Sequence, residues 1–467
     1  MKSDPLSLSR RSFLLQAAAT PLAFSALSLL LTRTGFASGP TPAPFGPIKR
    51  DPHRLLDLPE GFTYTVLIRN GDTMTDGLFS PGQPDGMAAF GSGPGKTTLI
   101  RNHEIIENEG MSAFGKKAER LDRVDFSRVY DRGKEIPPFG GTTTLIYNHE
   151  TDSLEASFMS LAGTCYNCAG GPTPWNSWLS CEEDVTRAGG SFQRDHGYVF
   201  EVPVTSSPGL VYPKPITAMG RFRHEATAVD PNSGVVYLTE DRPDGILYRY
   251  IPNVPGKLHE GGRFQVLRVK GRPSCDTRNW ESRSIKLNER MDVEWFDIDG
   301  IDSPADDLRY RGYDRGAARF ARNEGMWYGN DGVYFASTNG GPALAGQIWR
   351  YVPSPHEGTP QEKDAPATLT LFVESPEASI MNMCDNICVA PWGDLFVCED
   401  GTDVNRVLQV TREGEVHVFA RNALSKSEFC GGCFSPDGSV FFVNSQADGA
   451  TYAIKGPWQR SNASVSR

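Results

Sequence analysis

Apolar and polar residues alternate along most of this chain, and β-branched and aromatic residues dominate the alternating runs. A period of two residues is typical of strands, and clusters of Gly, Pro, Asn and Asp separate the runs as turns do. One short unit returns six times: an extended run, a turn, and a second strand that ends on acidic or amide residues. Clear copies begin at His224-Glu225 and Asp385-Asn386, and they end at Glu240-Asp241 and Glu399-Asp400. The pattern therefore predicts an all-β chain made of six similar units.

Each repeated unit predicts a hairpin followed by one more strand. Spacing between the units is irregular, roughly 45 to 100 residues, which indicates insertions at about 105–141 and 253–320. We predict a six-bladed β-propeller with insertions between strands, because radial repetition leaves only short protected edges. A pair of packed sheets is the alternative, and it does not explain six copies. The second strands are expected at 97–102, 177–181, 235–239, 333–337, 395–398 and 440–444, and the next strands at 142–147, 197–202, 245–251, 347–352, 407–411 and 451–454.

Acidic residues gather at one end of the predicted hairpins. The first strand of an antiparallel hairpin starts at the end where the second strand finishes, so each unit delivers two polar clusters to one rim. Carboxylates crowded this closely cannot all stay ionised without cations. Ordinary turn hydrogen bonds are the alternative for any single acid. The rim positions are Asp85, Asn167-Cys168, His224-Glu225, Glu324, Asp385-Asn386 and Glu428 at strand starts, and Asn102-His103-Glu104, Glu182-Glu183, Glu240-Asp241, Asn339, Glu399-Asp400 and Gln446 at strand ends.

The chemistry of these side chains indicates a metal site. Hard oxygen ligands suit calcium, or a trivalent iron or manganese centre. The lone thiol among them, Cys168, favours a transition metal over calcium alone. Arg322 precedes the first strand of the fourth unit and shares a face with Glu324 in an extended segment. Its guanidinium suits a phosphate bound over such metals, because it offers planar bidentate donors. A salt bridge between Arg322 and a nearby acid is the alternative.

Composition narrows the function classes. The formal net charge is −10, which argues against a nucleic-acid partner. No glycine-rich nucleotide loop follows a strand and opens a helix, and no G-x-S-x-G elbow occurs. Nine cysteines leave at least one outside any disulfide. The pairs Cys165-x-x-Cys168 and Cys430-x-x-Cys433 offer zinc ligands, but both lie at strand starts rather than on knuckles, so we do not expect zinc.

The N-terminus predicts export. Arg10-Arg11 stands before an apolar run at 17–31 that is short for a membrane span, with a small-residue site near Ala37. We expect a twin-arginine signal peptide at 1–37, a linker at 38–58, the propeller at 59–457 and a tail at 458–467. Twin-arginine export moves folded proteins, often after a cofactor has been inserted. We therefore expect a periplasmic or secreted monomer that meets the twin-arginine translocon during export.

Several segments together resemble the PhoX-type alkaline phosphatases. The most specific is the run from Tyr166 to Trp175, which is followed by Leu179-Ser180-Cys181-Glu182-Glu183. The resemblance spans about residues 60 to 450 and includes the twin-arginine start. The other similar blocks are Gly220-Arg221-Phe222-Arg223-His224-Glu225, Arg322-Asn323-Glu324, Asp385-Asn386 with Glu399-Asp400-Gly401, and Cys433-Phe434-Ser435-Pro436-Asp437-Gly438.

This resemblance implies a six-bladed propeller that hydrolyses phosphate monoesters and takes small phosphorylated substrates. It implies a site with two ferric irons, about three calcium ions and a bridging oxo group. Cys168 is then an iron ligand, Arg322 holds the substrate phosphate, and Glu324 completes the catalytic set. The implied metal ligands are Cys168, Glu183, Glu225, Glu324 and Asp400, with Glu240, Asp241 and Asp385 as less certain members.

The chain also departs from the family pattern. Residues 444–449 lack the His-Pro-Gly that commonly follows Gln446, and Cys165, Cys384, Cys388 and Cys430 are extra. Two other functions therefore remain open. A calcium-dependent propeller lactonase uses one divalent ion and has no use for a thiolate. A non-catalytic binding propeller of the cell envelope would use its acids structurally.

Overall fold

The computed structural model describes residues 43–105 and 111–458. The chain consists of two units, residues 1–46 and 47–467. The first unit is described only at residues 43–46, so the predicted twin-arginine segment and the boundary at 37 lie outside the described residues. Most of the predicted tail at 458–467 also lies outside them. Among the described residues, no helix combines the length and the apolar character needed to cross a membrane.

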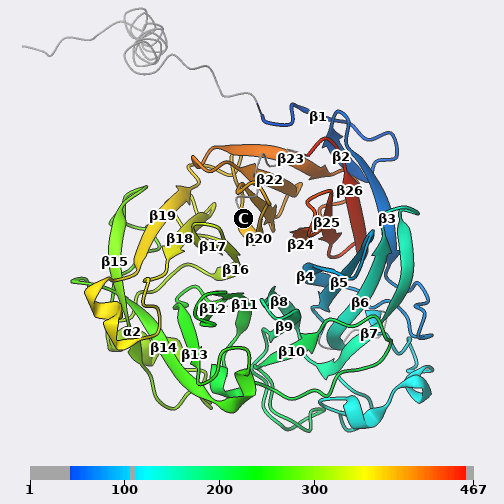
Figure 1. Cartoon of the computed structure of the whole chain (residues 1–467), viewed down its shortest axis with the longest axis horizontal. Coiled ribbons are helices and arrows are strands. Elements are labelled where there is room, and N and C mark those ends of the chain that lie inside the picture. The colour runs from blue at the N-terminus through cyan, green and yellow to red at the C-terminus, as the bar shows by residue number, and fades with distance from the viewer. Residues whose placement is uncertain (1–42, 106–110, 459–467) are drawn as a thin grey trace, which may run out of the picture. The chain divides into compact units, whose positions relative to one another are not determined.

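The second unit is almost entirely β-structure, and its sheets stand around a common axis (Figure 1). Six inner strands, β4, β8, β11, β16, β20 and β24, pack one against the next, and β24 packs against β4. This closed ring is a propeller-like arrangement, which confirms the all-β prediction. The inner strands are β4 (Pro84–Gly91), β8 (Asn167–Pro172), β11 (His224–Val229), β16 (Asn323–Gly329), β20 (Cys384–Val389) and β24 (Phe429–Phe434).

The second strand of each predicted unit pairs with its inner strand. All six lie within a residue or two of their predicted bounds, because turn residues and strand periodicity mark them clearly in the sequence. They are β5 (Lys96–His103), β9 (Ser177–Glu182), β12 (Val236–Glu240), β17 (Gly332–Ser337), β21 (Leu395–Glu399) and β25 (Val440–Ser445). The next strands are β6 (Gly140–Asn148), β10 (Val199–Pro203), β13 (Tyr248–Pro252), β18 (Gln347–Val352), β22 (Arg406–Val410) and β26 (Ala450–Lys455).

Outer strands complete the sheets and link them. β7 (Ser153–Thr164) follows β6, and β23 (Val416–Asn422) follows β22. β3 (Thr63–Arg69) pairs with β26 from the other end of the chain, so the first and last parts of the ring are held in one sheet. β1 (Ile48–Lys49) and β2 (Leu56–Pro59) extend the sheet of β20–β23, although residues 48–58 were expected to be linker.

The nine-stranded sheet differs from the prediction of separate blades. It consists of two antiparallel runs, β11–β14 and β16–β19, which β15 joins edge to edge. Its strands β14 (Gly262–Val269), β15 (Arg290–Asp297) and β19 (Thr368–Glu374) include two in the region 253–320. The prediction that this whole region is an insertion was therefore wrong: β14 is rich in apolar and β-branched residues, as a regular strand is.

The remaining elements are short. The helix α2 (Leu308–Asp314) follows β15, and the 3-10 turns are brief. The ring is held by large side chains between sheets: Trp178, Trp349 and Tyr237 are almost completely buried. Burying each such side chain contributes roughly 1.5–3 kcal/mol before entropy is counted. The 3-10 turns are η2 (Leu121–Arg123), η3 (Phe126–Arg128), η4 (Thr217–Met219), η5 (Leu258–Glu260) and η6 (Pro360–Asp364).

Candidate metal centre

Every inner strand carries a β-bulge close to its start. In β4 the register shifts between Pro84 and Met87, and the other five inner strands shift at the corresponding place. A bulge puts two residues opposite one and re-aims a side chain. The first bulged residue is ionisable in five of the six strands. These bulge positions hold Asp85, Cys168, Glu225, Glu324, Asp385 and, in β24, Gly431.

The bulges bring sequence-distant ligands together into three groups. Within each group the nearest ligand atoms lie within 4.8 Å of one another. Cys168 belongs to two groups and Glu225 to two, so the three groups form one continuous cluster. Glu104 and Glu183 join it from the ends of β5 and β9. The groups are Asp85 with Glu104 and Cys168, Cys168 with Glu183 and Glu225, and Glu225 with Glu324 and Asp385.

The residue before an inner strand helps to position the acid that follows the second strand of the same blade. Gln83, Tyr166, Arg322 and Met383 all have positive φ, between 43° and 55°. The carbonyl oxygens of Gln83, Tyr166 and Met383 each accept a 2.9 Å hydrogen bond from the backbone N–H of the acid that ends the second strand. Those acids are Glu104, Glu183 and Asp400. Such backbone strain costs about 1–3 kcal/mol per residue and concentrates at functional sites.

The cluster is deeply buried and crowded with like charge. Burial raises the pKa of Asp85 to about 6, and burial followed by the charge of Asp241 raises the pKa of Glu183 to about 8. Burial also raises the pKa values of Glu225, Glu324 and Asp385 well above their usual range, and neighbouring carboxylates add to the rise. The protein alone therefore does not neutralise these groups, and multivalent cations are the natural counter-charge.

Glu225 provides the sharpest test of whether these residues fit a metal. Its side chain is completely buried, and neither carboxylate oxygen has a hydrogen-bond partner among the described residues. One oxygen of Asp85 is in the same condition. An unpaired buried polar group costs about 1–3 kcal/mol. Oxygen atoms of this kind, beside a thiol and further carboxylates, fit a site for hard and borderline cations.

Arg322 lies at the edge of the cluster. Its Nε and Nη2 donate to the two oxygens of Asp241 at 2.9 and 2.8 Å, and Nη2 also donates to Glu324 at 2.7 Å. The charge of Glu324 raises the pKa of Arg322 above its usual value. The guanidinium is therefore fixed in place beside the predicted ligands, with its side chain about a quarter exposed (26%).

Three predicted ligands lie outside the three groups. Glu240 turns away from the cluster: Tyr248 donates to it at 2.8 Å and Arg309 forms an ion pair with it at 3.3 Å. Chain neighbours at a strand end face opposite sides, which is why Asp241 faces Arg322 while Glu240 does not. Asp400 lies next to Glu428, with which it shares a hydrogen bond, and close to Asp85 and Asp385.

Sequence reasoning left several cluster residues out of the ligand set. Asp85 and Glu104 were recognised as rim positions but not chosen, although they occupy the same places in the repeat as Glu225 and Glu183. Tyr166 hydrogen-bonds Glu104, and Gln446 donates to both Asp85 and Glu104. The equivalent positions of Asp85 and Glu104 in the repeated unit were the signal in the sequence that could have identified both residues.

The structure describes all nine cysteines, and it contains no disulfide between any of them. Cys168 is the only cysteine in the three ligand groups found among the described residues, so neither Cys-x-x-Cys pair builds a zinc site there. Burial raises the pKa of Cys168 well above its usual range, with Asp85 and Glu104 acting in the same direction. A thiolate at this position needs a cation to be stable.

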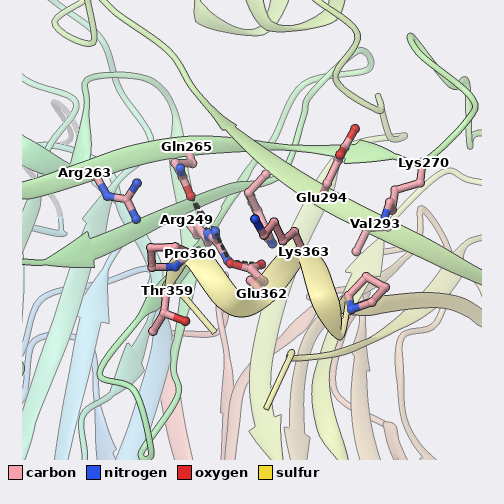
Figure 2. Close-up of a pocket in the computed structure, with 12 residues that line it drawn as sticks. Arg249, Arg263, Gln265, Lys270, Val293, Glu294, Thr359, Pro360, Glu362 and Lys363 are labelled. Atoms are coloured by element: carbon pink, nitrogen blue, oxygen red, sulfur yellow. Dashed lines mark hydrogen bonds and ion pairs between the residues drawn. The ribbon is translucent and has the colours of Figure 1, made fainter. Parts of the chain in front are cut away.

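Little space remains between the inner strands. The void between the inner strands has a volume of about 10 Å³ and is lined by Gly86, Met87, Trp178, Met326 and their neighbours. A larger pocket of about 360 Å³ lies elsewhere, between β14, β15 and η6 (Figure 2). Its central Arg249 is already bound by Glu357 at 2.6 Å and by Glu362 at 2.8 Å, so this arginine is structural.

Comparisons with known proteins agree with this architecture. The model of the family described as alkaline phosphatase PhoX matches residues 43–449. The solved Pseudomonas fluorescens PhoX in complex with vanadate, a transition state analogue, is 18% identical, with 86% of this chain and 96% of that chain covered and a TM-score of 0.60. A Xanthomonas campestris gluconolactonase is 10% identical, with 84% and 98% covered and a TM-score of 0.41. No curated protein matches the sequence.

The all-β ring and the family match together define a propeller-like phosphatase. The family match covers most of the chain, so the chain belongs to the PhoX alkaline phosphatase family. This confirms the predicted family and enzyme class, and the solved PhoX structure confirms the propeller-like fold.

Proposed function

We propose that this protein is an exported, metal-dependent phosphatase that hydrolyses phosphate monoesters at the cluster around Cys168 and Glu225. One observation carries the proposal: the three ligand groups form one cluster, because Cys168 and Glu225 each belong to two of them. Within it, both oxygens of the buried Glu225 lack a hydrogen-bond partner among the described residues. A continuous string of neighbouring acids suits several adjacent cations better than one. The single-ion lactonase is therefore the weaker candidate.

The ligands that we propose are the members of the three groups together with Asp241 and Asp400. The family resemblance supports two ferric irons, about three calcium ions and a bridging oxo group. Ions of this charge, when bound, neutralise the charge that develops on phosphoryl oxygens. Glu240 is excluded from the proposed set, because Arg309 and Tyr248 already satisfy it.

The chain's own residues then position the substrate. Arg322 binds the phosphate, and Asp241 holds the guanidinium so that little side-chain entropy is lost on binding. Cys168 and Glu324 shape the centre from β8 and β16, on strands rather than loops.

The fold and compartment complete the proposal. We propose six blades, with β11–β14 and β16–β19 as separate blades joined by β15; the six inner strands with their equivalent bulges support this number. The twin-arginine segment at 1–37 supports export to the periplasm or beyond, where we propose that the mature protein acts as a monomer on small phosphorylated compounds.

Elemental analysis combined with one activity assay tests this function. The protein is purified after twin-arginine export, its metals are measured, and p-nitrophenyl phosphate hydrolysis is followed at alkaline pH. We expect iron and calcium in a multiple of the protein concentration, and activity that chelators abolish. A single calcium without iron, or no hydrolysis by the metal-loaded protein, overturns the proposal.

A further inference from the structure

Arg223 occupies the same place in its blade as Arg322 does in the next. Arg223 directly precedes β11 and Arg322 directly precedes β16, and these two inner strands pack side by side. Both side chains are partly exposed to a similar degree, 28% and 26%. The repeat therefore presents two guanidiniums at neighbouring positions of one rim.

Glu183 links the two arginines in space. Arg223 Nη1 donates to the backbone oxygen of Glu183 at 2.8 Å and lies 3.8 Å from its carboxylate. Glu183 is also within electrostatic range of Arg322. Arg223 and Arg322 thus both lie next to one member of the ligand cluster.

The two arginines differ in how fully they are paired. Asp241 binds Arg322 with both oxygens, and Glu324 adds a third contact. Arg223 has only its contacts with Glu183 among the described residues, and its buried Nε has no hydrogen-bond partner there. A guanidinium carries five N–H donors, so most of those on Arg223 are available.

We propose that Arg223 is a second anion-binding residue, which together with Arg322 binds the terminal oxygens of a phosphate monoester. This inference rests on the proposed phosphatase function. A monoester dianion presents three terminal oxygens and two charges, which match two guanidiniums. A phosphodiester presents two terminal oxygens and one charge, so Arg223 contributes less to its binding than to the binding of a monoester. Arg223 is therefore a specificity-determining residue for monoesters over diesters.

The test compares Arg223→Gln with Arg319→Gln in the metal-loaded protein. Arg319 is a matched control, because its side chain is equally exposed (28%) and Asp276 holds it at 2.7 and 3.0 Å. Calorimetry measures the binding of inorganic phosphate, and elemental analysis measures the bound metals. Assays with p-nitrophenyl phosphate and bis(p-nitrophenyl) phosphate give kcat and KM for a monoester and a diester.

Loss of a charge-assisted arm worth about 1.5–3 kcal/mol weakens phosphate binding by roughly 10- to 100-fold in Arg223→Gln. We expect the kcat/KM of the monoester to fall by the same factor, that of the diester to fall less, and Arg319→Gln to match the wild type. Arg223→Lys keeps a donor for the Glu183 carbonyl but lacks the planar fork, and we expect it to keep its metals and still bind phosphate weakly.

Two outcomes separate this inference from the function on which it rests. Wild-type affinity for phosphate in Arg223→Lys and in Arg223→Gln, with metals retained, overturns the role of Arg223 and leaves the phosphatase intact. Failure of the wild-type protein itself to bind phosphate or hydrolyse the monoester overturns the proposed function instead.

Discussion

Two sets of buried carboxylates lie a few residues apart in this protein and differ in whether the chain provides each carboxylate with a cation. The outer carboxylates, Glu182, Glu240 and Glu399, each have a cation from the chain: His196 at 2.6 Å, Arg309 at 3.3 Å and Arg406 at 2.6 Å. The bulge carboxylates, Asp85, Glu225, Glu324 and Asp385, instead face one another, and only Glu324 has an arginine partner.

This difference shows that the burial of a carboxylate does not by itself reveal whether it has a charged partner. Both sets are almost inaccessible to solvent, yet every outer carboxylate has a cation from the chain, and in the bulge set only Glu324 has one. Burying a charge without a partner is far more costly than burying a pair, so ionised bulge carboxylates need counter-charge beyond the one arginine that the chain provides. The outer set stabilises the fold through ion pairs within the chain, and the bulge set is the part of the molecule that suits the proposed metals.

Removal of metals is expected to have the largest effect. Chelation leaves the bulge carboxylates without counter-charge and does not touch the outer pairs. An ion present at about a thousand times its Kd contributes roughly 4 kcal/mol per site to stability. We therefore expect chelated protein to lose all phosphatase activity and to unfold at a clearly lower temperature in calorimetry. Equal unfolding temperatures with and without chelator contradict the comparison.

Glu225→Gln tests a single bulge carboxylate. We expect about a 1000-fold loss of activity, equivalent to roughly 4 kcal/mol of transition-state stabilisation, together with a loss of bound metal. The metal-free variant is expected to be at least as stable as the metal-free wild type in denaturant unfolding, because one crowded acid is gone. The matched control is Glu240→Gln, equally buried but already paired, which should keep its full metal content.

Arg309→Met tests an outer carboxylate by removing its cation. Burial raises the pKa of Glu240 to about 7, and Arg309 opposes this rise. Breaking a buried ion pair from one side costs about 3 kcal/mol, and we expect that loss in urea unfolding with metal content unchanged. The double variant Arg309→Met with Glu240→Gln should recover part of the stability. A variant that loses metals instead would place Glu240 in the metal centre.

His196 gives the smallest effect, one that depends on pH. Burial alone lowers the pKa of His196, but the charges of Glu182 and Asp131 outweigh it and raise the pKa to about 10. The folded pKa lies above the unfolded value of about 6.5, so the stabilisation is complete below pH 6.5 and is lost as pH rises through 10. We expect wild type to exceed His196→Gln in unfolding free energy at pH 6 and the gap to close near pH 10. A constant gap contradicts a charged His196.

The repeat was readable in the sequence because strand period, turns and acidic strand ends are local signals. The inner and second strands follow from it, and so do Cys168, Glu183, Glu225, Glu324 and Asp385 as members of one rim. The error at 253–320 arose from relying on the spacing between units, since β14 has the apolar and β-branched composition of an ordinary strand. Glu240 and Asp241 look alike in the sequence, and only the strand end assigns them to opposite faces, where Glu240 pairs with Arg309 and Asp241 with Arg322.

The sequence by itself determined that this is an all-β chain of the PhoX family whose acids repeat in step with its strands. Only the tertiary structure decided which acids have a cation from the chain and which do not. That decision depends on contacts between residues far apart in the chain, such as Glu240 with Arg309 or Arg223 with Glu183. The bulges and the packing of neighbouring strands set these contacts, and no local pattern in the sequence specifies them.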